Sequence, residues 1–276
     1  MVSATNRHMK SDIQSKETSS PKALTARPSP RQVGREKRAK ALRWVYSWGW
    51  SSPSVLACVA NDNGNGLAAR LVRQGLLKRT RTESGGGHKN VPASILTLTA
   101  AGIIEVERDL RRAEDLLPYE LDAHRVQQAL LRHDTLAQLT TAKALQAGSI
   151  TGYLTERELR RRSANGVKQP DVVWVSPHGL WAIEIELSAK WGKDLDHFVL
   201  ACIDSLEQGS NGAPARFAFV CVVSDAPAIL ERYKRAFSEG APVGVWRRDA
   251  SRHWVKTCAR KVPGWAQKRL LWKKID

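Results

Sequence analysis

The chain has 276 residues, of which 42% are hydrophobic and 26% charged, and its formal net charge at pH 7 is +17. This length allows one large domain or two smaller ones, with enough apolar residues for a substantial core. The sequence contains no long uninterrupted apolar run, and its polar N-terminal stretch lacks the apolar segment of a secretory signal. Its four cysteines are widely spaced, without a CxxC pair or a zinc pattern. We therefore expect a cytoplasmic protein with reduced thiols and no membrane partner.

The positive charge is concentrated at the two ends of the chain. Residues 1–44 contain eleven Lys or Arg against three acids, and residues 247–276 contain ten against two, so each end carries +8 and residues 45–246 carry +1. A balanced body with basic extensions is typical of a protein that binds a polyanion such as nucleic acid. The alternative is that the basic ends serve only solubility or nonspecific binding.

The first part of the chain has the element order of a winged helix-turn-helix. Residues 1–34 lack apolar periodicity, which predicts a disordered basic arm. Three helices are expected next, over residues 35–48, 54–60 and 67–74. A hairpin follows, with strands over residues 76–82 and 94–98 and a glycine-rich loop between them. We place this DNA-binding domain at residues 35–117.

The third helix and the hairpin are basic, which indicates contact with double-stranded DNA. In a winged helix-turn-helix the third helix enters a major groove and the wing follows the backbone. Six side chains are candidate DNA contacts: Arg70, Arg73, Lys78, Arg79, Arg81 and Lys89. The alternative is a winged helix that contacts protein instead.

Residues 118–250 have the pattern of a mixed α/β domain. The expected elements are a helix over 124–145, a strand over 148–153, a helical or looped segment over 155–160, a hairpin over 171–187, a helix over 195–206, a buried strand over 217–223, a helix over 227–237 and a strand over 242–246. Residues 251–276 are expected to be a basic tail, in which Trp265 and Trp272 are candidates for stacking on a single strand. The predicted fold class is α/β (α+β).

The hairpin over residues 171–187 carries three acidic residues in a pattern that predicts a metal site. Glu184 and Glu186 lie on the same side of a strand because side chains alternate between faces, and hairpin pairing can bring Asp171 beside them. Carboxylates this close resist joint ionisation unless a cation lies among them, and hard oxygen ligands suit Mg²⁺ or Mn²⁺. We therefore expect a divalent-metal site for phosphodiester chemistry.

These residues also carry a resemblance to a known family. Pro170-Asp171 followed by Glu184-x-Glu186 resembles the PD-(D/E)xK nuclease fold, in the variant where Glu replaces the usual Lys. With a winged helix in front, and with His133-Asp134, Thr155-Glu156-Arg157 and the segment from Glu184 to Lys190, the chain is similar to the replication-relaxation family, to which the MOBC relaxases of plasmid mobilisation are related. The likeness covers about residues 40–225.

The resemblance implies a DNA endonuclease or nickase that depends on Mg²⁺ or Mn²⁺ and acts in plasmid mobilisation or replication, or a noncatalytic relative of such an enzyme. It makes Asp171 and Glu184 metal ligands, and Glu186 a ligand or general base. It also makes Glu156 a further metal ligand. Lys190 would orient the attacking water or offset charge on the phosphate, and His133 would be an accessory acid or a structural partner.

Simpler interpretations remain open for the same residues. Asp171 could cap a turn, Glu184 and Glu186 could form the solvent face of an edge strand, and His133 could be a core histidine. The chain would then be a winged-helix replication or mobilisation factor, or a repressor, whose second domain serves as a scaffold for a homodimer or for relaxosome proteins. The position of the three carboxylates relative to one ion discriminates between the two functions.

Overall fold

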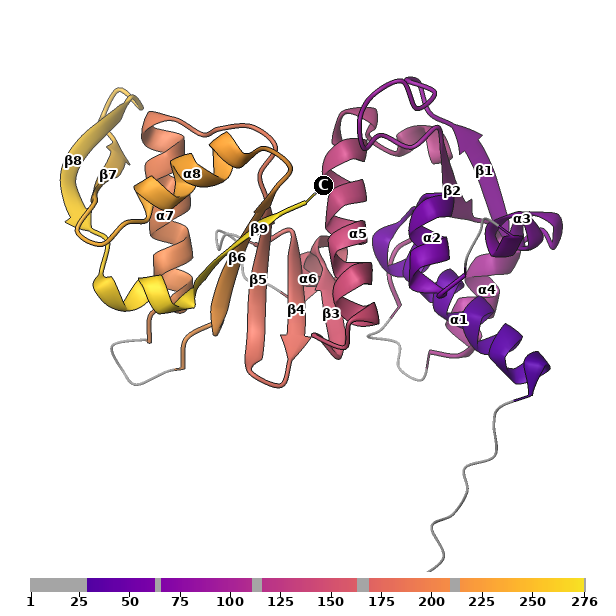
Figure 1. Ribbon diagram of the computed structural model, residues 1–276. Coiled ribbons are helices and arrows are strands. Elements are labelled where there is room, and N and C mark those ends of the chain that lie inside the picture. The colour runs from indigo at the N-terminus through magenta and orange to yellow at the C-terminus, as the bar shows by residue number, and fades with distance from the viewer. Residues whose placement is uncertain (1–28, 63–65, 111–115, 163–168, 209–213, 276) are drawn as a thin grey trace, which may run out of the picture.

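The computed structural model describes residues 29–62, 66–110, 116–162, 169–208 and 214–275 (Figure 1). The N-terminal half consists of four helices and a hairpin. In chain order these are α1 (Pro30–Trp48), α2 (Pro53–Val59), α3 (Gly66–Arg73), β1 (Leu77–Arg81), β2 (Ser94–Leu98) and α4 (Ala100–Arg108). Three helices before a hairpin is the order expected from the sequence.

The starts of α1 and α2 follow from their capping residues. The Ser52 side chain accepts a hydrogen bond from the Val55 N–H at 3.2 Å, and Pro53 occupies the first helical turn. Ser29 caps α1 in the same way, so α1 begins at Pro30. Residues 30–34 are therefore helical, which corrects the expectation that they belong to a disordered arm. Residues 1–28 of that arm lie outside the described residues.

The hairpin forms a wing with a tight tip. β1 and β2 are antiparallel with Leu77 opposite Leu98, and an isolated bridge pairs Ser51 with Leu96. At the tip Gly86 has a φ of +86°, and a Cβ on it would meet the Ala93 Cβ at 3.0 Å. Glycine is favoured there because it has no Cβ to clash.

The second half alternates strands and helices. After two single turns of 3-10 helix at Ala123–Arg125 and Gln128–Leu130, its elements are α5 (Leu131–Gln146), β3 (Gly152–Thr155), α6 (Glu156–Arg162), β4 (Val172–Ser176), β5 (Gly179–Ile185), α7 (Gly192–Leu206), β6 (Phe219–Ser224), α8 (Pro227–Ala236), β7 (Pro242–Arg248), β8 (Trp254–Lys261), η4 (Gly264–Arg269, a 3-10 helix) and β9 (Leu270–Lys274).

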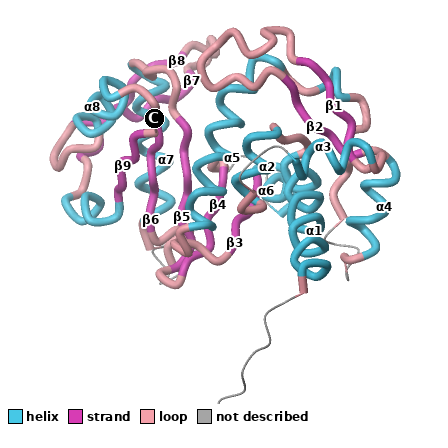
Figure 2. Tube along the Cα trace, turned by 45° about the vertical axis from the view of Figure 1, so that its right-hand side comes forward, coloured by secondary structure: helices cyan, strands magenta, loops and turns pink. Residues whose placement is uncertain are grey.

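The central sheet is covered by helices on both faces (Figures 1 and 2). Its strand order is β3-β4-β5-β6-β9, in which β3, β4 and β5 are antiparallel and β5, β6 and β9 are parallel. Val172, Ile183 and Val223 pack toward α5, whereas Ala182 and Val222 pack toward α7 and α8. This arrangement confirms the predicted mixed α/β class. No helix in the described part of the chain is long and apolar enough to cross a membrane.

The C-terminal segment differs from the sequence expectation. Residues 254–261 pair with β7, and residues 270–274 form the fifth strand of the central sheet, so the described part of 251–276 is not a tail. Leu270 and Trp272 pack under α7 and α8, and Leu271 packs on the opposite face. The sequence did not predict this last strand because only three consecutive apolar residues lie between basic ones. Such a short run does not indicate a strand, and the lysines that follow dominate the composition.

Two further boundaries differ. The helix expected over 124–145 is regular only from Leu131, because the preceding residues form separate 3-10 turns, and the strand expected over 148–153 lies at Gly152–Thr155. The last helix of the N-terminal half, α4, ends at Arg108, and residues 111–115 lie outside the described part.

The two halves share polar contacts around α6. Arg157 donates hydrogen bonds to the backbone carbonyls of Tyr46, at 2.6 Å, and Pro118, and its guanidinium lies 5.5 Å from the centroid of the Tyr119 ring. The Thr155 hydroxyl donates to the Ser47 carbonyl at 3.0 Å. Thr155 and Arg157 belong to a motif that carries the family resemblance, and here both join the winged helix to the central sheet.

Candidate active site

The hairpin places Asp171 beside the end of β5. Asp171 directly precedes β4, whose first residue Val172 pairs with Ile183. The Asp171 N–H donates to the Ile183 carbonyl at 3.1 Å, and its Oδ2 accepts the Ile185 N–H at 2.7 Å. Glu184 lies between these two residues of β5, and its side chain shares the sheet face of Ala182, which packs toward α7. The predicted hairpin and the predicted proximity of Asp171 to Glu184 are therefore present.

One cavity brings together five of the predicted site residues. It has a volume of about 590 Å³ and lies beside the first turn of α5, at the end of the hairpin away from its turn. The predicted residues in its lining are His133, Asp171, Glu184, Glu186 and Lys190. Glu184 and Glu186 are only 6% and 5% exposed, so they do not form the solvent face of an edge strand.

Glu186 is held by two donors. The Tyr233 hydroxyl of α8 donates to Glu186 Oε2 at 2.7 Å, and the Lys190 ammonium forms an ion pair with Oε1. Burial, followed by the hydrogen bond to Glu186, raises the pKa of Tyr233, so this hydroxyl stays a donor. Lys190 brings positive charge beside Glu186, although it is four residues further along the chain than the lysine of the usual nuclease pattern.

His133 lies between two carboxylates at the start of α5. Its Nε2 is 3.2 Å from Asp171 Oδ2, and its Nδ1 is 3.0 Å from Asp134 Oδ1. Burial disfavours the charged imidazole, but hydrogen bonds and charge attraction from both aspartates outweigh it and raise the pKa of His133 to about 10. Near pH 7 both ring nitrogens therefore carry protons. His133 orients Asp171, whose Oδ2 also accepts the Ile185 N–H at 2.7 Å.

Fewer side chains are placed to bind a metal ion than the sequence predicted. Within the described residues, no three His, Cys, Asp or Glu side chains are grouped so that they could hold a metal ion. The Glu156 side chain is 51% exposed and pairs with Arg160 on α6 at 2.6 Å, outside the cavity lining. Both oxygens of Glu186 accept from Tyr233 and Lys190. The prediction that Glu156 and Glu186 complete a ligand set with Asp171 and Glu184 is thus corrected.

Two of the predicted ligands, Asp171 and Glu184, line the same cavity. In proteins Mg²⁺ keeps several waters and is commonly bound by one or two carboxylates together with substrate phosphates. The volume of the cavity leaves room for water and a phosphate beside these two carboxylates.

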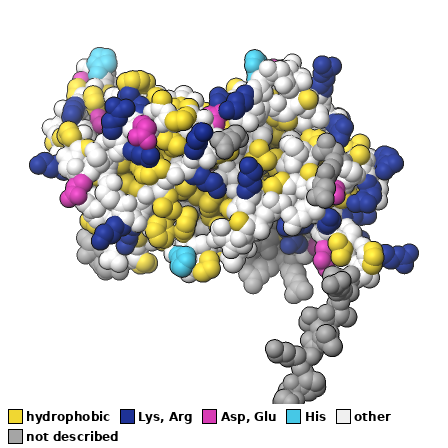
Figure 3. Space-filling view, viewed as in Figure 1, with side chains coloured by type: hydrophobic (Ala, Val, Ile, Leu, Met, Phe, Trp, Pro, Cys, Tyr) yellow, Lys and Arg dark blue, Asp and Glu magenta, His cyan; other side chains and the backbone are white. Residues whose placement is uncertain are grey.

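The six predicted DNA contacts are all exposed on α3, β1 and the wing loop. On the face shown in Figure 3, Lys and Arg side chains are scattered over both halves of the molecule. Arg70 lines a second cavity, of about 600 Å³, together with Arg35 and Arg38 of α1 and Arg108 of α4. The basic surface near α3 thus continues onto α1 and α4.

Two groups at the cavity rim were not identified from the sequence. Arg132 lines the cavity and donates to Asp225 Oδ2 at 2.6 Å. Asp225, only 3% exposed, also accepts from Asn90 of the wing at 3.4 Å and lies 4.0 Å from the ammonium of Lys89. Asp225 follows β6 at its carboxyl end, where α/β proteins commonly place functional groups. This position after a predicted buried strand could have identified Asp225 from the sequence.

Comparison with known proteins identifies no family. No family model matches this chain, and no curated protein matches it. Among solved structures, the chain is similar to the crystal structure of protein VC1899 from Vibrio cholerae, with 16% sequence identity and a TM-score of 0.27 over 76% of this chain and 51% of that chain. The chain thus spans about half the length of that protein, and the low score carries no functional argument.

Proposed function

We propose that this chain is a divalent-metal-dependent DNA nickase or endonuclease that acts in the cytoplasm on DNA of a plasmid or other mobile element. The proposal depends on one observation: Asp171 and Glu184 line one cavity together with Glu186, Lys190 and His133. Buried carboxylates beside a lysine at an accessible cavity are the arrangement that metal-assisted phosphodiester hydrolysis requires.

Each side chain has a distinct task in this proposal. Asp171 and Glu184 would hold Mg²⁺ or Mn²⁺, which supplies Lewis-acid stabilisation of the phosphate and a water of lowered pKa. Lys190 offsets negative charge on the phosphate, and Glu186 keeps Lys190 in place while Tyr233 fixes Glu186. His133, protonated near pH 7, orients Asp171 and is unsuited to act as a base.

The winged helix supplies DNA binding in this proposal. Its exposed arginines and lysines neutralise backbone phosphates, which provides affinity without base recognition. The contacts of Asp225 with the wing and with Arg132 connect this half to the cavity, so DNA bound along the wing passes near the carboxylates.

The test is a nicking assay on supercoiled plasmid with the variant Glu184→Gln. This change keeps the shape of a buried side chain but removes its negative charge, so we expect Mg²⁺- or Mn²⁺-dependent nicking to fall by at least about a hundredfold, corresponding to several kcal/mol of lost charge stabilisation. DNA affinity in a gel shift should stay nearly unchanged.

The matched control is Glu231→Gln, which removes an exposed carboxylate on α8 that pairs with Lys234. It should nick DNA like the unchanged protein. Equal nicking by Glu184→Gln and the unchanged protein would rule out this site, and equal loss of nicking and DNA binding would point to misfolding.

A second function is favoured by the contacts of Glu186. Because Lys190 and Tyr233 already bind both its oxygens, the same cavity could be a stable polar core in a noncatalytic replication or mobilisation factor, or in a repressor. The unchanged protein would then bind DNA through the winged helix and dock a second copy or relaxosome proteins through the central sheet. In the assay above it would shift DNA without nicking it in Mg²⁺ or Mn²⁺.

A further inference from the structure

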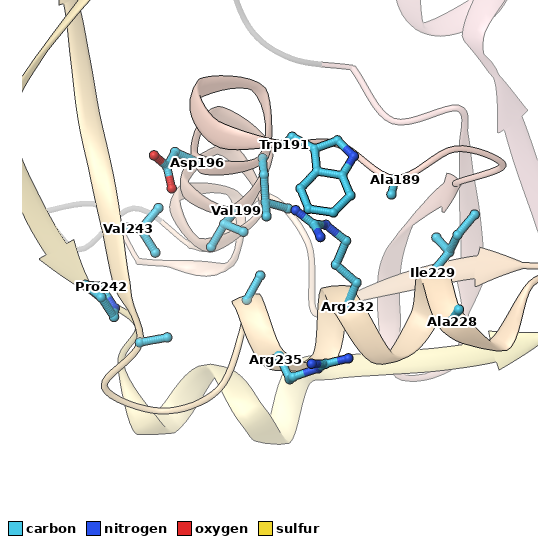
Figure 4. A pocket seen from close by; sticks show the side chains of 13 residues that line it. Ala189, Trp191, Asp196, Val199, Ala228, Ile229, Arg232, Arg235, Pro242 and Val243 are labelled. Atoms are coloured by element: carbon cyan, nitrogen blue, oxygen red, sulfur yellow. The ribbon is translucent and has the colours of Figure 1, made fainter.

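A separate cavity opens on the other side of the segment that carries Lys190. It has a volume of about 600 Å³ and lies between α7, α8 and the start of β7 (Figure 4). Its floor is apolar, with Val199, Ile229 and Val243 among the lining residues. Four polar or aromatic groups also line it: Trp191 before α7, Asp196 on α7, and Arg232 and Arg235 on α8.

Trp191 is held in place but remains accessible. The Arg232 guanidinium carbon lies 3.0 Å from the centroid of the Trp191 ring, and Arg232 Nε donates to the Lys190 carbonyl at 3.0 Å. Trp191 is nevertheless 67% exposed. Because Arg232 covers one face of the indole, the accessible area belongs to its other face and its edge. A fixed ring with one accessible face is a platform for a second flat group.

The charges around the cavity specify the kind of flat group. Arg232 and Arg235 provide two positive charges, and Asp196 provides one carboxylate, whose Oδ2 accepts the Trp246 indole N–H at 2.7 Å. A nucleobase with its attached phosphate combines a flat ring, polar edges and negative charge. The excess of arginine over acid matches the phosphate, and the apolar floor matches the ring.

The cavity is adjacent to the candidate active site along the chain. Ser188 and Lys190 line the site with the carboxylates, whereas Ala189 and Trp191 line this one, so the same short segment separates the two. The hydrogen bond of Arg232 to the Lys190 carbonyl ties the platform to the residue that we assign to the phosphate. Consecutive Cα atoms, such as those of Lys190 and Trp191, are only about 3.8 Å apart. The two cavities are therefore close enough for adjacent nucleotides of one strand to occupy both.

We propose that this second cavity binds an unpaired nucleobase of the DNA strand next to the phosphate to be cleaved, with the base stacked on Trp191 and its phosphate held by Arg232 and Arg235. This rests on the proposed nuclease function for its place in the reaction. A base inside a duplex cannot present its face to Trp191, so the strand must be single or locally opened. The cavity thus selects single-stranded or unwound DNA near the cut.

The test compares two labelled probes by fluorescence anisotropy on the full chain, without divalent cation. One probe is an oligothymidylate, and the other is an oligomer of the same length and charge that lacks bases. Trp191→Ala should weaken binding of the oligothymidylate by roughly 5- to 150-fold, the range for loss of one base–aromatic stack. It should leave binding of the baseless oligomer unchanged, and Trp191→Phe should retain most of the affinity.

Trp254→Ala is the matched control, because Trp254 is also exposed, with the Lys193 ammonium 4.7 Å from its ring, but lies outside the lining of this cavity. It should bind both probes like the unchanged protein. An unaltered affinity of Trp191→Ala for oligothymidylate, or equal losses with both probes, overturns the proposal. Thymidine monophosphate binding as tightly as the oligomer would overturn it too, since the ligand would then be a free nucleotide.

Failure of the nuclease proposal gives a different result. If no variant or condition yields nicking, but Trp191→Ala still loses affinity only for the probe with bases, the cavity binds a nucleobase in a noncatalytic DNA-binding protein. The binding measurement is made without metal, so it does not depend on the carboxylates.

Discussion

At the scale of single residues, Tyr233 determines how Glu186 is held. Its hydroxyl donates to the buried Glu186 carboxylate at 2.7 Å, and Tyr233 is itself fully buried. Removal of that hydroxyl in Tyr233→Phe leaves a buried carboxylate with one fewer donor. Hydrogen bonds to charged groups contribute about 1.5–3 kcal/mol, so the free energy of unfolding should fall by that amount in urea denaturation.

The double variant Tyr233→Phe with Glu186→Gln provides the control. If the loss arises from the contact between the two side chains, Tyr233→Phe should cost less when Glu186 is already neutral. An equal cost in both backgrounds would attribute the effect to the other contact of the hydroxyl, its hydrogen bond with the Lys190 backbone.

The sequence predicted the carboxylates together with Lys190 and His133, but not Tyr233 or Arg132. Alternation of side chains along β5 and the length of the turn placed Glu184, Glu186 and Asp171 on one face, because both are local properties of a hairpin. Tyr233 and Arg132 reach the cavity from helices far away in the chain. Their contacts depend on how α5 and α8 pack on the sheet, which spacing along the sequence does not encode.

At the scale of elements, the wing is attached to the central sheet through Asp225. The Asp225 carboxylate contacts Arg132 of α5 and Asn90 and Lys89 of the wing loop. Asp225→Asn keeps the shape but removes the charge that faces these donors. We expect the free energy of unfolding to fall by about 1–3 kcal/mol and hydrogen exchange in the wing loop to become faster.

Asp204→Asn is the control for this prediction. Asp204 pairs with Arg260 at 2.8 Å, but both side chains are about half exposed. Exposed ion pairs contribute at most about 1 kcal/mol, so this change should alter stability little and leave exchange in the wing unaffected. Comparable effects of the two substitutions would mean that Asp225 does not hold the wing in place.

Strong periodic or apolar segments predicted most elements. Each of these signals depends only on residues close together in the chain. Examples are the apolar run of β6, the turn at Pro177-His178 and the capping side chain of Ser52. β9 was missed because its apolar residues are few and its pairing with β6 joins segments about fifty residues apart. Such pairing is stabilised by tertiary contacts, so the local composition of the strand does not predict it.

At the scale of the whole molecule, the positive charge is distributed between structured and terminal parts. α1 and the β8 strand lie at opposite sides of the view in Figure 1, so the basic residues near the two ends of the chain flank the body. Residues 1–28 contain five Lys or Arg against two acids, a net charge of +3. Their removal leaves the Ser29 cap of α1 in place.

Deletion of residues 1–28 should therefore test phosphate binding without loss of the fold. If this segment binds phosphates, the slope of log affinity for duplex DNA against log salt should become shallower by about 0.9 for each phosphate that the segment neutralises. A version in which the five basic residues are replaced by Gln should behave like the deletion. An unchanged slope would assign the salt dependence to the winged helix alone.

The position of β9 at the edge of the central sheet affects how the protein is made. Until residue 274 has left the ribosome, β6 has a partner on one side only, and its other edge presents unpaired backbone beside an apolar surface. Such an edge invites pairing with other chains. A nascent chain shortened by a premature stop before residue 270 would thus be a substrate for chaperones and proteases rather than a smaller working protein.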